Sequence, residues 1–299
     1  MRYSLISIVA LPAALILLPV LAQPSFGQNG GGRGQNAARG QAPAAPAKPT
    51  PRWPDGTVNW GAPIGEKGLW NVAGGVFADP DPVPGQPPAA QRGRGGNPYP
   101  GKPTLSQVPF QPWARAIYDY RQQNQLEPYT RCKPSGAFRQ VATAYGTQLV
   151  NFPELKQFII FQTGGSHSFR TIYMDGREHP KNLAPSYYGD NIGHFEGDTL
   201  VVDTVGYNER MWISNLEGMP HTDRLHTIER FTRLDFNTIK YEMTIDDPGA
   251  YTTTWKTGWF MNWSPGVESF EFICQDNNHA PELMVGSMEA VDRNSSFVP

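Results

Sequence analysis

Residues 188–208, with the sequence YGDNIGHFEGDTLVVDTVGYN, decide the fold. Glycines divide this stretch into short runs of β-favouring residues, and a tight Glu196-Gly197-Asp198 turn separates two of them. Short apolar runs bounded by Gly and Asp are typical of β-hairpins. Ionisable side chains lie between the glycines: Asp190, His194, Glu196, Asp198 and Asp203. The stretch therefore predicts a β-sheet and a candidate site in the same place.

Extended segments recur on both sides of this stretch, roughly every 10–15 residues, and no helical segment separates them. This spacing predicts an antiparallel barrel or sandwich rather than a parallel α/β sheet. Asp175-Gly176 has the composition of a two-residue hairpin turn. One helix is expected at Pro112–Asn124, with Trp113, Ile117 and Tyr120 near one face. The expected strands are 155–163, 168–174, 199–206, 225–233, 239–245, 251–261 and 267–274.

The strand expected at 225–233 mixes apolar and ionisable residues on both faces. Glu229 shares one face with Phe231, whereas His226 and Arg230 share the other with Ile228. A sandwich would separate these residue types more cleanly. We therefore expect a closed or nearly closed antiparallel barrel of about eight strands, a size that holds one small ligand.

Composition divides the chain into five predicted segments. Residues 1–22 resemble a signal peptide, because Arg2 precedes an apolar run and small residues end it at Ala22. Residues 23–52 form a Gly/Pro/Gln-rich tail expected to be disordered. Residues 53–125 are expected to be loop-rich with one short helix, 126–278 to form the barrel, and 279–299 a C-terminal extension.

The predicted signal peptide places the mature protein in the periplasm or outside the cell. Its apolar run is short for a membrane span, so no stable membrane insertion is expected after its removal; a retained N-terminal anchor is the alternative. Cys132 and Cys274 lie at opposite ends of the predicted barrel. In an oxidising compartment this pair predicts a disulfide, and two buried free thiols are the alternative.

The charge of the chain narrows its partners. The chain carries 25 basic and 27 acidic residues. Five of the basic residues and none of the acidic ones lie in 1–52, which leaves 20 against 27 and a net charge of −7 for the rest. An acidic domain lacks the positive surface that nucleic acid requires, so a small molecule is the expected partner. The sequence carries no signal for an oligomeric state.

Three segments, GDNIGHFEGDTLVVDTVGYN, PHTDRLHTIERF and TIDDPGAY, resemble a widespread and largely uncharacterised family of secreted bacterial proteins. The resemblance runs from about Arg131 to Asn277. It implies a lipocalin-like barrel. It implies no reaction and no catalytic residue.

The residues themselves favour acid/base chemistry. Asp203 interrupts the apolar run LVVDTV, and an isolated buried carboxylate would be very costly, so Asp203 is expected to have a partner or to face a lumen. His226 is the preferred base, because its ordinary pKa lies nearest to neutral pH. Glu229, Arg170 and Tyr173 complete the predicted catalytic set. The alternative is that these groups form structural ion pairs between strands.

Other motifs are less informative. His221, His226 and Glu229 have the spacing H-x4-H-x2-E, which suits neither a helix nor one face of a strand, so no metal site is predicted. No nucleophile elbow or nucleotide-binding glycine loop is present, and no cofactor is expected. His221, His194, Trp212 and Trp255 are predicted to contribute to binding, because polar-tipped aromatic residues suit a pocket wall.

Two classes of function follow from these observations. The leading hypothesis is a secreted or periplasmic enzyme that acts on a small cyclic or aromatic molecule by elimination, isomerisation or hydration. The alternative is a lipocalin-like protein that binds such a molecule without changing it. A structural or assembly protein is a third class. A packed barrel interior would favour the third class over the first two.

Overall fold

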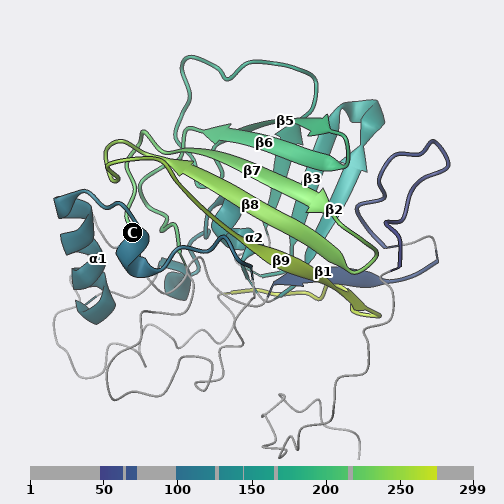
Figure 1. Ribbon diagram of the computed structural model, residues 1–299, viewed down its shortest axis with the longest axis horizontal. Coiled ribbons are helices and arrows are strands. Elements are labelled where there is room, and N and C mark those ends of the chain that lie inside the picture. The colour runs from purple at the N-terminus through teal and green to yellow at the C-terminus, as the bar shows by residue number, and fades with distance from the viewer. Residues whose placement is uncertain are drawn as a thin grey trace, which may run out of the picture. The chain divides into compact units, whose positions relative to one another are not determined.

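A computed structural model describes residues 48–62, 65–72, 99–124, 128–143, 145–164, 168–214 and 218–274. The predicted signal peptide, most of the 23–52 tail and the 279–299 extension lie outside these residues. The described part is mostly β, with few helices, and its strands form a closed barrel of nine strands (Figure 1). None of its helices has both the length and the apolar character needed to cross a membrane.

The strands follow one another around the barrel in chain order, and β1 pairs with β9 to close it. Neighbouring strands are antiparallel except β4 and β5, which are parallel. The barrel is therefore mixed and nine-stranded, not antiparallel with about eight strands. The strands are β1 (Gly68–Val72), β2 (Thr147–Phe152), β3 (Gln157–Gln162), β4 (Ser168–Tyr173), β5 (Asp190–Glu196), β6 (Thr199–Val205), β7 (His226–Arg233), β8 (Thr238–Asp246) and β9 (Trp255–Pro265).

The hairpin expected at Asp175-Gly176 is wrong, and its absence explains the parallel pair. The residues after Gly176, Arg-Glu-His-Pro, are polar and end in proline, so they offer no strand to pair with β4. Residues 174–189 instead form a long loop that crosses above the barrel in Figure 1. Because the loop carries the chain back before β5 begins, β5 runs in the same direction as β4.

Three strands come from outside the expected set, and one of them, β5, lies in the glycine-punctuated stretch before the Glu196-Gly197-Asp198 turn. The stretch expected to be loop-rich supplies β1, and β2 precedes the first strand that the pattern indicated. Conversely, residues 267–274 form no strand. β9 already has β8 and β1 as neighbours, so the closed barrel leaves no edge onto which a strand after Pro265 could add.

Helix α1 (Pro112–Asn124) has the predicted bounds, but a different face is buried. Ala114 and Tyr118 are buried, whereas Trp113 and Tyr120 are exposed. The short helix α2 (Ala137–Val141) is wholly buried. It packs where β3 ends, with Phe138 against Tyr207 and the Gln140 amide donating to the Gly164 carbonyl. Single 3-10 turns occupy Leu105–Gln107, Pro128–Arg131 and Pro153–Leu155.

Alternate side chains of the strands fill the barrel interior. The burial pattern of β7 and β8 is strictly alternating, as a barrel wall with one inward face requires. Tyr241 lies at the centre of the packing, stacked on Trp259 with ring centroids 4.3 Å apart and edge-on to Phe231 at 4.8 Å. Packed side chains, many of them aromatic, therefore fill the interior. A packed interior is the outcome expected for a structural or assembly protein, so the case for ligand binding rests on the barrel wall rather than on an open lumen.

The disulfide between Cys132 and Cys274 is confirmed, with Cα atoms 5.5 Å apart and a sequence separation of 142. The alternative of two free thiols is wrong. The bond ties the segment before α2 to the chain that follows β9. A disulfide fits an oxidising location outside the cytoplasm.

Candidate functional site

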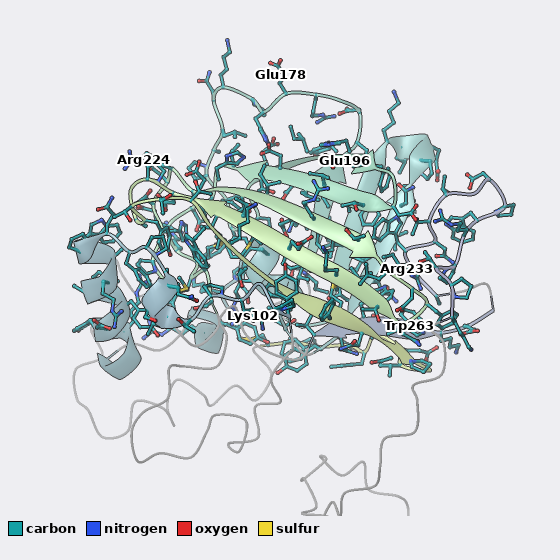
Figure 2. The ribbon with its side chains drawn as sticks, in the orientation of Figure 1. Lys102, Glu178, Glu196, Arg224, Arg233 and Trp263 are labelled. Carbon is teal, nitrogen blue, oxygen red and sulfur yellow. A yellow bond between two sulfur atoms is a disulfide. The ribbon has the colours of Figure 1, made fainter. Side chains whose placement is uncertain are left out.

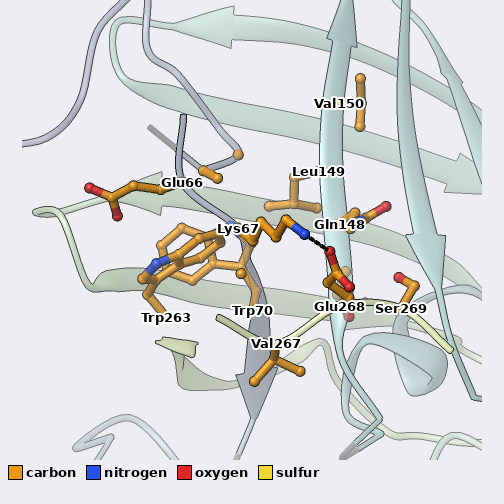
Figure 3. A pocket seen from close by; sticks show the side chains of 14 residues that line it. Glu66, Lys67, Trp70, Gln148, Leu149, Val150, Trp263, Val267, Glu268 and Ser269 are labelled. Carbon is orange, nitrogen blue, oxygen red and sulfur yellow. Dashed lines mark ion pairs between the residues drawn. The ribbon is translucent and has the colours of Figure 1, made fainter. Parts of the chain in front are cut away.

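A groove of about 550 Å³ opens in the barrel wall between β1 and β2 (Figure 3). Three segments that are distant in sequence line it: residues 61–70, 147–150 and 263–269. Among the described residues, β1 and β2 pair only at Trp70 and Thr147. The groove therefore lies where backbone pairing between neighbouring strands is least extensive.

The floor of the groove is aromatic and rigidly held. Trp70 and Trp263 pack edge to face, with ring centroids 5.1 Å apart. Nε1 of Trp70 donates to the Trp60 carbonyl over 2.8 Å, and the guanidinium of Arg233 lies 4.9 Å from its ring centroid. A Cβ on Gly68 would lie 2.2 Å from Cζ2 of Trp263, so glycine is needed for β1 to pass this ring. The site is thus built before any ligand arrives.

The rim of the groove is charged and open to solvent. Lys67 and Glu268 form an ion pair across it, drawn as a dashed line in Figure 3, and their side chains are 70% and 62% exposed. Gln148 and Val267 are exposed beside this pair. A pair this exposed contributes little to stability. Glu66, which is also exposed in the lining, adds a negative charge at the entrance.

Inside the barrel, Arg170 of β4 and Glu229 of β7 form a fully buried ion pair. Arg170 Nη1 donates to Glu229 Oε1 over 3.1 Å, and the Tyr241 hydroxyl donates to the same oxygen over 2.7 Å. Burial opposes the charge on Arg170, but Glu229 outweighs it and raises the Arg170 pKa. Burial and then the Glu229 charge raise the pKa of Tyr241 far above its ordinary value. This pair joins opposite walls of the barrel.

A second ionisable cluster lies on the outer face of the barrel. Oδ1 of Asp203 accepts from Nε2 of His226 over 2.8 Å and from Nε2 of His179 over 3.1 Å. Nδ1 of His179 lies 2.7 Å from Oδ2 of Asp190. The cluster links the 174–189 loop to β5, β6 and β7, whereas Glu178 of the same loop projects away from the barrel (Figure 2).

The shared carboxylate shifts the ionisation of its partners. The hydrogen bond that His226 donates to Asp203 is the main cause that raises the pKa of His226. Partial burial opposes ionisation of Asp203, but the hydrogen bonds and charges of His226 and His179 outweigh it and lower the Asp203 pKa. Both side chains are more than one third exposed, so these groups are accessible from solvent.

The predicted catalytic residues therefore do not share a lumen. Arg170 and Glu229 point inward, whereas Asp203, His226 and Tyr173 lie on the outward-facing positions of their strands. Tyr173 packs under the Arg177 guanidinium, 3.8 Å from its ring centroid. The expectation of one converging site is therefore corrected: the residues form two separate clusters. Two residues of one strand face opposite sides of the sheet when their positions differ by an odd number, as those of His226 and Glu229 do.

The predicted binding residues are dispersed, and none lines the groove. His221 is buried between the backbone carbonyls of Met211 and Thr222, and burial lowers its pKa. His194 is exposed and contacts Glu196. Trp212 packs under Arg121, and Trp255 against Tyr251. His221, His226 and Glu229 thus have three different sets of partners, and no described group of three or more His, Cys, Asp or Glu is placed to hold a metal ion.

The sequence reasoning missed several residues that these sites use. His179 lies in an irregular loop, where no periodicity marks its direction. Trp70 and Trp263 come from the first and last strands, so only barrel closure brings them together. Tyr241 alternates with Met243 and Ile245 along its strand, so the pattern indicates only an apolar face, although a buried tyrosine hydroxyl needs a hydrogen-bond partner.

The chain was compared with protein-family models, curated proteins and solved structures, and none of them matches. The class of protein that the structure defines is therefore a closed β-barrel with a disulfide. The resemblance to secreted bacterial proteins stays an expectation from the sequence.

Proposed function

We propose that this protein binds a small molecule, as a lipocalin-like barrel with its site in the β1–β2 groove. The observation that carries the proposal is a preformed groove of about 550 Å³ with an aromatic floor and a polar rim. Ligand sites commonly have volumes of roughly 300–1,000 Å³ and this mixture of lining groups. The ligand is expected to be cyclic or aromatic, to match Trp70 and Trp263.

Binding accounts for the groove better than catalysis does. Neither Asp203 and His226 nor Arg170 and Glu229 line it. A general acid or base must lie within hydrogen-bond reach of the reacting atom and have a pKa near neutral pH. The ionisable pair of the groove, Lys67 and Glu268, lies exposed at the rim, and the hydrogen bond to Glu268 raises the pKa of Lys67 still further above neutral. We place the protein in the periplasm or outside the cell, which the disulfide and the predicted signal peptide support.

Ligand-detected NMR against a set of uncharged aromatic and alicyclic compounds tests this proposal. Gln148→Trp fills the groove from an exposed position, so we expect it to abolish binding without unfolding the protein. Lys256→Trp is the matched control, because Lys256 is exposed on the outer face of β9 and does not line the groove. Binding that survives Gln148→Trp, or an absence of any binding, would refute the groove as the site.

An acid/base enzyme is the second candidate, favoured by the Asp203–His226 pair on the outer face. A histidine held by a carboxylate can transfer protons to a substrate that docks beneath the 174–189 loop. If so, His226→Ala and Asp203→Asn should abolish turnover of a screened substrate while the melting temperature holds. His194→Ala, an exposed histidine outside the cluster, should retain it. Retained turnover in both cluster variants would exclude this candidate.

A further inference from the structure

We infer that a ligand in the groove reaches the unpartnered amide of Gln162, and that this ligand is an uncharged ring compound with a hydroxyl group. This inference rests on the binding function proposed above and specifies its chemistry.

The pairing of the strands places Gln162 next to the lining of the groove. Trp70 pairs with Thr147, Thr147 with Gln162, and Gln162 with Ser168. Inward positions alternate along each strand, and these four residues occupy inward positions of β1, β2, β3 and β4. Trp70 and Thr147 line the groove, and Gln162 is the neighbour of Thr147 on the next strand around the wall. A ring that rests on the tryptophan floor therefore directs its leading edge towards Gln162.

The polar groups at that position lack hydrogen-bond partners among the described residues. Gln162 is only 3% exposed, and both its amide oxygen and its amide nitrogen are without a partner. Nε of Arg170, on the neighbouring strand, is in the same condition. Buried polar groups that are not hydrogen-bonded cost free energy, which a ligand that supplies both a donor and an acceptor would recover. A hydroxyl group is the smallest group that does both.

An ionic ligand group would find no free counter-charge next to Gln162. The Arg170 charge is already neutralised by Glu229 inside the barrel, and that of Lys67 by Glu268 at the rim. Glu66, the remaining charged residue of the lining, is exposed to solvent at the rim. A carboxylate or ammonium group moved next to Gln162 would lose its hydration without meeting a free counter-charge. The site therefore selects uncharged compounds.

Four probes test the inference by isothermal titration calorimetry: phenol, cyclohexanol, toluene and benzoate. We expect phenol to bind at least tenfold more tightly than toluene, which has the same ring without the hydroxyl, and benzoate not to bind. Comparison of phenol with cyclohexanol shows whether the ring is aromatic or alicyclic; the inference holds in either case.

The variant Gln162→Leu tests whether the Gln162 amide recognises the hydroxyl group of the ligand. It removes both unpartnered amide atoms at similar volume, so the phenol preference over toluene should disappear while toluene binding persists. The melting temperature should stay the same or rise, which a purely structural glutamine would not allow. Gln157→Leu is the matched control, because Gln157 is on the same strand with its side chain on the outward face; it should change nothing.

The outcomes separate the two proposals. Equal affinity of the protein for phenol and toluene, or a preference that survives Gln162→Leu, overturns this inference and leaves the binding function standing. Failure of all four probes, together with failure of the wider compound set, overturns both.

Discussion

The barrel wall has two kinds of junction between strands. β7, β8 and β9 pair along eight residues at each junction, whereas among the described residues β1–β2 and β4–β5 pair at one position each. The groove lies at the first of these sparse junctions, and the loop that carries His179 follows the strand of the second. At both sparse junctions, side chains take the place of backbone pairing. Both candidate sites therefore occur where backbone pairing between strands is sparse.

The largest effect on stability is expected from the buried ion pair between Arg170 and Glu229. Glu229→Ala leaves Arg170 buried without a counter-charge and Tyr241 without its acceptor, so the free energy of unfolding should fall by about 3–5 kcal/mol. Denaturant unfolding measures it. Replacing both charged partners, with Arg170→Met and Glu229→Leu, should recover most of the loss. A single variant as stable as the double variant would contradict this account.

Removal of the disulfide is expected to have the second-largest effect on stability, and to affect some strands more than others. Cys132→Ser combined with Cys274→Ser should lower the free energy of unfolding by about 2–4 kcal/mol, because the unfolded chain regains the freedom of a long loop. The bond ties the segment before β2 to the chain after β9. Hydrogen exchange should therefore accelerate more in β1 and β2 than in β7 and β8. Uniform acceleration would argue against a special role at the groove.

A smaller, pH-dependent effect is expected at the outer cluster. The raised pKa of His226 contributes stability that is complete below about pH 6.5 and is lost as the pH rises through the folded value. The lowered pKa of Asp203 contributes stability that is present above about pH 4 and is lost as the pH falls. Asp203→Asn should therefore cost most between these values, less than about 1 kcal/mol because solvent screens the exposed pair. Thermal unfolding from pH 3 to 9 measures this, and a pH-independent difference would contradict it.

The smallest effect is expected at the groove rim. Lys67→Gln breaks the pair with Glu268, but both side chains are mostly exposed, so the unfolding midpoint should not change measurably. The midpoint of denaturant unfolding, compared with that of Glu229→Ala, measures the contrast between an exposed and a buried pair. A clear loss of stability would mean that the rim pair braces the β1–β2 junction.

Local pattern was sufficient for some features of the fold and not for others. The helix at Pro112–Asn124 and the Cys132–Cys274 bond could be predicted, because capping, periodicity and compartment act locally or on composition. The direction of Asp203 could not be, since Leu200, Val201 and Val202 are all buried and the strand shows no alternation to read. Glu229 is tolerated inside only because Arg170 arrives from a strand 59 residues earlier.

The groove could not be read from the sequence for a different reason. Its lining comes from three segments that become neighbours only through closure of the barrel. Gly68 and the tryptophans had no local signal for a site, because their role depends on how closely β1 approaches β9. The unpartnered Gln162 was likewise invisible, since a glutamine at the end of an apolar strand usually faces solvent.

Closure between the first and last strands also determines when this protein can complete its fold. Gly68 pairs with Pro265, about 200 residues later in the chain, and contacts of such long separation form slowly. During synthesis β9 emerges after every other strand, and until then β8 and β1 each present an unpaired edge to other chains. A chain that stops before Trp255 is therefore not a smaller barrel but an open sheet prone to associate, and the groove exists only in the finished molecule.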